Sequence, residues 1–122
     1  MRLLLDSHIL VWWMADDARL GAARRRQIAR AEVRFSPLSV WELRFKQLAG
    51  RLDLGDLPLI EELTAQGFAE LPLTSEHAER ALALPPVHRD PVDRFLIAQA
   101  LVEGLTLVTD DETIRRYPVA VL

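Results

Sequence analysis

Cysteine is absent from this chain of 122 residues, and lysine occurs only once, at position 46. The lack of cysteine excludes disulfide bonds, thiolate metal sites and a cysteine nucleophile, and it is compatible with a reducing cytoplasm. No apolar run approaches the ~20 residues of a membrane-spanning helix, so we expect no membrane contact. The N-terminus reaches the charge of Asp6 too soon to form a signal-peptide core. These absences predict a cytoplasmic protein.

Glycine is also scarce, and its five copies are scattered, so the chain has no glycine-rich phosphate loop. No serine lies in a Gly-x-Ser-x-Gly turn. His8, His77 and His88 show no His-x-x-x-His spacing, and we interpret each as a surface or capping residue. All of the basic residues except Lys46 are arginine, which recognises phosphate through a planar fork of donors and is also frequent in GC-rich genomes.

Half of the residues are hydrophobic, which is enough for a single domain spanning residues 1–122. Short apolar segments alternate with longer amphipathic ones, and this predicts an α/β fold with a central parallel sheet of four to five strands flanked by helices. We expect strands at 3–5, 33–36, 68–71 and 105–109, with a short fifth at 119–122. We expect helices at 8–15, 19–31, 37–49, 58–66, 75–84 and 90–103. Such sheets bind ligands beyond the carboxyl ends of their strands, where the strand order reverses.

Six acidic residues stand where this fold would gather them at one edge. They are Asp6, Glu42, Asp90, Asp93, Asp110 and Asp111. Carboxylates are hard oxygen ligands that suit Mg²⁺ or Mn²⁺, and crowding them without a cation is unfavourable because like charges repel. The net charge of −3 does not indicate nucleic-acid binding, but four metal-bound carboxylates would leave +1 on the rest of the chain. The pattern suggests a divalent-metal hydrolase.

Each acid also has an ordinary structural explanation. Asp6 can cap the helix that follows it, and Glu42 stands in the favourable order for a helical ion pair with Lys46. The acids at 90–93 suit a helix N-terminus, and those at 110–111 suit a turn. Their joint order along the chain, rather than any one of them, favours the metal site.

Four blocks of the sequence resemble the PIN-domain family, and specifically the VapC-type toxins of type II toxin–antitoxin pairs. The blocks are LLLDSHILVW at 3–12, SPLSVWEL at 36–43, HRDPVDRFLIAQA at 88–100 and LVTDD at 107–111. They occur in the family's order and span nearly the whole chain, so the resemblance implies one PIN-like domain. The family's four acidic positions correspond to Asp6, Glu42, Asp93 and Asp111. Asp110 occupies the variable place before the fourth acid, and Asp90 is an extra acid that a subset of relatives shares.

The resemblance implies a metal-dependent endoribonuclease that cuts single-stranded or looped RNA. Its catalytic and metal-binding residues would be Asp6, Glu42, Asp93 and Asp111, with Mg²⁺ as the cofactor and Mn²⁺ able to substitute. Candidates for substrate contact are Ser7, Arg89, Arg94 and Arg115. The family also implies a homodimer and a cognate antitoxin, for which the Trp-bearing helices near 10–14 and 38–48 would suit an interface.

Three alternatives share some of these features. The first is a structure-specific DNA nuclease with the same acidic site. The second is a catalytically inactive PIN-like module that binds RNA or protein, although such a module would be expected to lose some of the four acids. The third is a phosphate-receiver α/β domain, which would need a late lysine, whereas Lys46 lies in the middle of the chain.

Overall fold

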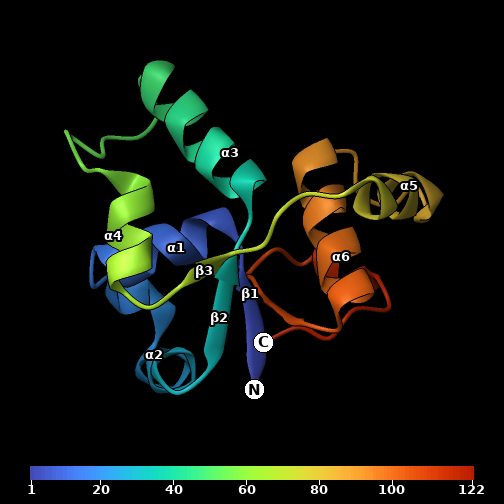
Figure 1. Ribbon diagram of the computed structural model, residues 1–122, viewed down its shortest axis with the longest axis horizontal. Coiled ribbons are helices and arrows are strands. Elements are labelled where there is room, and N and C mark those ends of the chain that lie inside the picture. The colour runs from blue at the N-terminus through green and yellow to red at the C-terminus, as the bar shows by residue number, and fades with distance from the viewer.

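The computed structural model describes residues 1–122 and contains one sheet of four parallel strands, as predicted (Figure 1). The strands are β1 (Arg2–Leu5), β2 (Glu32–Phe35), β3 (Ala69–Glu70) and β4 (Thr106–Val108). Their spatial order is β3-β2-β1-β4. The expected fifth strand at 119–122 is reduced to one parallel bridge between Leu107 and Val121.

Six α-helices cover the two faces of this sheet. They are α1 (Ser7–Met14), α2 (Ala22–Ala29), α3 (Pro37–Leu48), α4 (Leu59–Ala65), α5 (Ser75–Ala83) and α6 (Pro91–Glu103). Two short 3-10 helices, η1 (Ala18–Leu20) and η2 (Ile114–Arg116), complete the elements. In Figure 1, α1 to α4 lie on one side of the sheet, and α5 and α6 lie on the other. None of these helices combines the length and the apolar character that crossing a bilayer requires.

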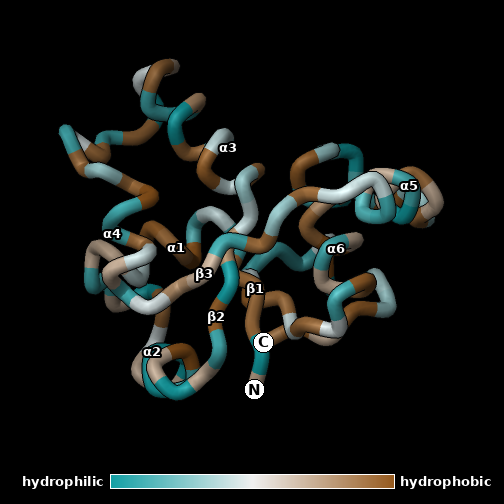
Figure 2. Tube along the Cα trace, in the orientation of Figure 1, coloured by the Kyte–Doolittle hydropathy of each residue, from teal (hydrophilic) through white to brown (hydrophobic).

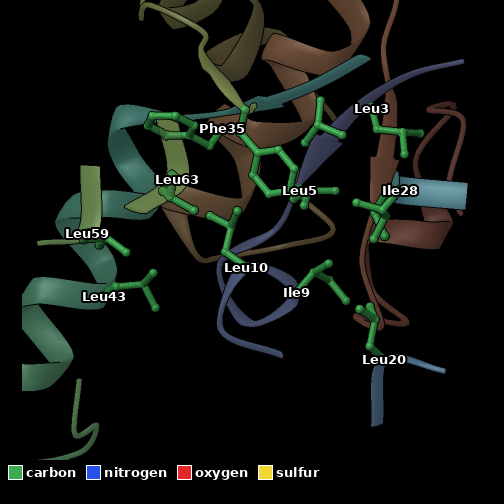
Figure 3. Packing of buried hydrophobic residues seen from close by; sticks show 13 residues of the cluster. Leu3, Leu5, Ile9, Leu10, Leu20, Ile28, Phe35, Leu43, Leu59 and Leu63 are labelled. Carbon is green, nitrogen blue, oxygen red and sulfur yellow. The ribbon is translucent and has the colours of Figure 1, made fainter. Parts of the chain in front are cut away.

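Strand β1 is the hydrophobic centre of the molecule, and Figure 2 shows it as an apolar stretch between the two helical layers. Successive side chains of a strand point to opposite faces. Leu3 and Leu5 therefore pack into the core beneath α1 to α4 (Figure 3), whereas Leu4 packs into the core beneath α5 and α6. All three are fully buried, which stabilises the fold by ~1.5–3 kcal/mol for each side chain. This double burial fixes the position of the residue that follows the strand, Asp6.

Local signals set the ends of α6 where the sequence predicts them. The side chain of Asp90 caps the first turn, Pro91 occupies the first helical position, and Gly104 ends the helix at a φ of +66°. The predicted helix at 19–31 is wrong at its first three residues. Gly21 has a φ of +88°, so the chain forms the separate η1 and then α2 instead of one continuous helix.

The strand order reverses beside β1, because β2 and β3 extend the sheet on one side and β4 joins it on the other. The carboxyl ends of β1 and β4 are therefore neighbours at the reversal point, where open α/β sheets bind their ligands. Asp6 follows β1, and residues 109–111 follow β4. The first turn of α6 lies at the same end of the molecule (Figure 1).

Candidate metal centre

Asp6 is 1% exposed and is held at both carboxylate oxygens. Its Oδ1 accepts a hydrogen bond of 2.6 Å from the backbone N–H of Ser7, at the start of α1. Its Oδ2 accepts one of 2.6 Å from the Oγ1 of Thr109, at the end of β4. The helix-capping explanation of Asp6 is thus correct for one oxygen, and the other oxygen joins β1 to β4.

Thr109 connects Asp6 to Asp111. Besides donating to Asp6, the Thr109 Oγ1 accepts a hydrogen bond of 3.0 Å from the backbone N–H of Asp111. The Asp111 Oδ1 accepts in turn from the backbone N–H of Thr113 at 2.8 Å. These bonds fix the Asp111 carboxylate and leave its Oδ2 facing His88.

His88 bridges two of the predicted acids. Its Nε2 lies 2.9 Å from the Oδ2 of Asp93 and 2.9 Å from the Oδ2 of Asp111. One ligand atom from each of these three residues lies within 4.8 Å of the others, so the group could hold a metal ion. The Nδ1 of His88 accepts from the backbone N–H of Asp90 at 3.2 Å, which leaves the proton of a neutral ring on Nε2.

The interpretation of His88 as a surface or capping residue explains the hydrogen bond at its Nδ1. It does not predict the contacts of its Nε2 with Asp93 and Asp111. Its side chain is only 15% exposed. His88 stands five residues before Asp93, which is outside the three- and four-residue spacings that place side chains on one helical face. The only sequence signal for His88 is its place at the head of the block at 88–100.

A hydrogen-bonded clamp holds the segment that carries His88. The guanidinium of Arg94 donates to the backbone carbonyls of Ala81, Leu84 and Pro85 at 2.8 to 3.0 Å. The Tyr117 hydroxyl accepts from the backbone N–H of His88 at 2.7 Å and donates to the carbonyl of Pro85 at 2.7 Å. The expectation that Arg94 contacts phosphate is not supported, because its fork of donors is already committed to these carbonyls.

Glu42 reaches the group from α3, with a side chain that is 13% exposed. The predicted ion pair with Lys46 is present, at 3.6 Å between Nζ and Oε1. Glu42 is also close enough to Asp93 for its charge to raise the pKa of that carboxyl group. It therefore faces both the acids and a lysine.

Negative charge accumulates around Asp93. Burial raises the pKa of Asp93 to about 7, and the charges of Asp6, Asp90 and Glu42 add to this effect, whereas His88 opposes it. For His88, burial lowers the pKa, but the hydrogen bond to Asp111 and the charges of the neighbouring carboxylates outweigh this and raise it. The group thus retains protons near neutral pH. A divalent cation would offset the repulsion between carboxylates that contributes to this.

Asp110 lies apart from this group. Its carboxylate pairs with the guanidinium of Arg24 at 2.7 and 3.1 Å, and this hydrogen bonding keeps the pKa of Asp110 below its usual value. Burial raises the pKa of Asp111, but hydrogen bonds from His88 and Thr113 outweigh that effect and lower it. Of the two adjacent acids, Asp111 is the one that contacts His88.

The remaining predicted substrate contacts have mixed surroundings. Ser7 is fully buried, and its Oγ has no hydrogen-bond partner although it stands beside Asp6. Arg89 is exposed next to His88. The Nη2 of Arg115 lies 3.5 Å from the carbonyl oxygen of Thr109, at the rim of the group.

Comparison with known proteins identifies the family of this chain. The sequence model of the PIN domain matches residues 3–120. The chain is 34% identical over 118 residues to "Ribonuclease VapC22" of Mycobacterium tuberculosis, and the match covers 93% of this chain and 90% of that protein.

Solved structures share the fold at low sequence identity. VapBC2 from Rickettsia felis, bound to a DNA fragment from its promoter, has a TM-score of 0.78 at 14% identity, covering 100% of this chain and 98% of that one. FitAcB from Neisseria gonorrhoeae has a TM-score of 0.69 at 22% identity, covering 98% and 96%. A toxin–antitoxin complex from Klebsiella pneumoniae has a TM-score of 0.68 at 18% identity, covering 98% and 95%.

Proposed function

The chain belongs to the PIN-domain family, and from this premise we propose that it is a metal-dependent endoribonuclease and the toxin of a type II toxin–antitoxin pair. The 34% identical relative is named a ribonuclease, which supports the choice of RNA as substrate. The observation that carries the proposal is the convergence of Asp6, Asp93 and Asp111 at the reversal point of the sheet, with Glu42 close to Asp93.

The residues present fit a divalent cation. The candidate ligands are carboxylate oxygens, which suit a hard divalent cation, and the charges of Asp6, Asp90 and Glu42 add to the burial that raises the pKa of Asp93. The buried, unpartnered Ser7 Oγ is a further polar atom beside Asp6. We assign Mg²⁺ or Mn²⁺ to Asp6, Glu42, Asp93 and Asp111.

A bound Mg²⁺ or Mn²⁺ would supply a water nucleophile at neutral pH and would stabilise charge on the phosphate. The protein contributes position and proton handling. Thr109 keeps Asp6 and Asp111 in fixed orientations, and Glu42 on α3 lies close enough to Asp93 on α6 for its charge to act on that carboxyl group. His88, at hydrogen-bond distance from two of the acids, can hold or release a proton at its Nε2. Arg89 and Arg115 remain candidates for phosphate contact.

The experiment that tests this proposal is cleavage of a mixed tRNA, rRNA and mRNA pool by the purified protein. Parallel reactions contain Mg²⁺, Mn²⁺ or EDTA, and an Asp93→Asn variant is the control. We expect discrete fragments with either metal and none with EDTA or with the variant. In a parallel competition between RNA and structured DNA, preferential cleavage of the DNA would indicate a DNA nuclease. Metal binding by a folded protein without any cleavage would indicate a binding module.

The protein partner is proposed from the names of the similar structures, which include VapBC and toxin–antitoxin complexes. We propose a cognate antitoxin and a homodimer for this chain. A row of apolar side chains on α3 suits a protein contact: Trp41, Phe45 and Leu48 are 57%, 50% and 90% exposed. Trp41 and Phe45 stack with their ring centroids 5.2 Å apart, and Figure 2 shows hydrophobic positions out to the far end of this helix.

A charge placed in this row tests the contact. Trp41→Glu should weaken antitoxin binding while metal affinity stays unchanged, because Trp41 points into solvent. Calorimetric titrations with the antitoxin and with Mn²⁺ measure the two effects separately. Equal loss of both would instead indicate unfolding.

A further inference from the structure

A cavity of about 220 Å³ opens beside the metal centre, between α1, α3 and the loop that follows α3. Three cationic side chains line it, those of Arg19, Lys46 and Arg51, and no acidic residue does. Its floor is apolar and includes Trp12 and the buried Leu43. Cationic side chains around an aromatic ring are the combination that binds the phosphate and the base of a single-stranded nucleic acid.

Two residues belong both to this cavity and to the surroundings of the acids. The Nε2 of His8 lies 3.6 Å from the Oδ2 of Asp6, and the Nζ of Lys46 lies 3.6 Å from the Oε1 of Glu42. The cavity therefore adjoins the metal centre on the side of Asp6 and Glu42. A nucleotide inside it would be joined to a phosphate at the acids by a short length of backbone.

A base that stacks on Trp12 would take the place that Arg19 occupies over the ring. The guanidinium carbon of Arg19 lies 5.2 Å from the centre of the Trp12 ring, and the His8 ring lies 5.7 Å from that of Trp12. The Arg19 side chain is 70% exposed and is held by Asp17, so a base on Trp12 would displace it toward solvent and not into the core. Bases of any sequence stack on an aromatic face, because each of them has a π surface.

The cationic charges differ in how far they are neutralised. Arg19 pairs with Asp17 at 2.7 Å, and Lys46 pairs with Glu42. Arg51 is exposed and has no ion pair, so its guanidinium is free to bind a phosphate.

We propose that this cavity binds one nucleotide of single-stranded RNA next to the cleaved phosphate, with the base on Trp12 and the backbone phosphate on Arg51. This inference rests on the proposed ribonuclease function and identifies a substrate contact outside the acidic residues.

The test measures binding of a short fluorescent single-stranded RNA to the Asp93→Asn variant by anisotropy, at several salt concentrations. In that background, Arg51→Glu should weaken binding roughly tenfold and should reduce the slope of log affinity against log salt by about 0.7. Trp12→Leu should weaken binding roughly five- to 150-fold through lost stacking. The matched control is Arg30→Glu, which makes the same charge change at an exposed arginine after α2, at the opposite edge of the sheet.

Because Trp12 packs against the core, Trp12→Leu could weaken RNA binding by destabilising the fold. If this variant loses thermal stability, the test relies on Arg51→Glu alone. Equal affinities and salt slopes for Arg51→Glu and Arg30→Glu would overturn the proposal and would leave the cavity to a protein partner. A cleavage assay on proteins that retain Asp93 separates the cavity assignment from the ribonuclease function. If the unaltered protein cuts RNA and Arg51→Glu cuts it with an unchanged KM, only the cavity assignment fails. If the unaltered protein cuts no RNA with either metal, the ribonuclease function itself fails.

Discussion

The hydroxyl of Thr109 donates a 2.6 Å hydrogen bond to the carboxylate of Asp6, across 103 residues of sequence. Thr109 is fully buried, and the same oxygen accepts from the backbone N–H of Asp111. One small polar side chain thus sets the distance between the first and the last acid of the centre. It is a positioning residue that the sequence pattern marks only as the neighbour of an acid.

Replacement of Thr109 by valine should therefore damage the centre without touching any of its ligands. Valine keeps the shape but leaves a buried carboxylate oxygen and a backbone N–H without partners, which should lower the free energy of unfolding by about 1–3 kcal/mol. Mn²⁺ affinity should fall as well. Urea denaturation and calorimetry measure the two effects, and Thr109→Ser, which keeps the hydroxyl, should restore most of both. A Thr109→Val variant with unchanged metal affinity would contradict the positioning role.

Asp110 and Asp111 should differ sharply in their effect on metal binding. Asp110 pairs with Arg24 on a side chain that is 42% exposed, and such a pair contributes at most about 1 kcal/mol to stability. We expect Asp110→Asn to leave Mn²⁺ affinity nearly unchanged and Asp111→Asn to reduce it at least tenfold. Isothermal titration of the two variants, which make the same chemical change at adjacent positions, decides between them.

The metal-free protein should become less stable as the pH rises from about 5 to 8. The folded-state pKa of Asp93, about 7, lies above the unfolded value near 4, so the folded protein binds this proton more tightly than the unfolded chain. The stability that results is fully present below the unfolded pKa and is lost as the pH rises through the folded pKa. The raised pKa of His88 acts in the same direction, because stability from its charged form is lost as the pH rises through that value.

Thermal unfolding in EDTA across this pH range measures the effect. Asp93→Asn should flatten the profile. Saturating Mn²⁺ should reverse it, because protons and the metal compete for the same carboxylates. A flat profile in the unaltered protein would contradict the raised pKa of Asp93.

The Arg94 clamp should prove structural. Arg94→Lys keeps the charge but cannot reproduce a planar fork aimed at several carbonyls, so we expect a loss of about 2–4 kcal/mol in unfolding free energy. Removal of the charge as well, in Arg94→Gln, should leave the salt dependence of RNA binding unchanged, because the donors of Arg94 are committed to backbone carbonyls. A reduced salt slope at normal stability would restore the original expectation that Arg94 contacts the substrate.

The parts of the fold that sequence reasoning finds are those with local causes. Helix α6 was predictable because Asp90, Pro91 and Gly104 each act on the backbone beside them. The strand at 119–122 was overestimated, because its pairing depends on how the C-terminal residues meet Leu107, which lies in a distant segment. The acids at 6, 93 and 111 were predictable as a group because strand ends and helix starts in a parallel sheet share one edge.

The parts that sequence reasoning missed depend on side-chain direction. His88 reaches Asp93 and Asp111 because Arg94 and Tyr117 fold its segment back over the start of α6. That fold involves backbone carbonyls, which leave no pattern in the residue types. The cavity beside Trp12 likewise depends on tertiary packing, because residues of the loop after α3 and residues of α1 line it together.

The 103-residue separation between Thr109 and Asp6 has a consequence for the timing of synthesis. A ribosome releases Asp6 early, but β4 and the acid that follows it leave the exit tunnel only after nearly all of the preceding residues. A partly synthesised chain therefore has no complete centre, whichever helices it has already formed. If the protein cuts RNA, the ribosome and the message that produce it are exposed to that activity only after almost the whole domain has emerged.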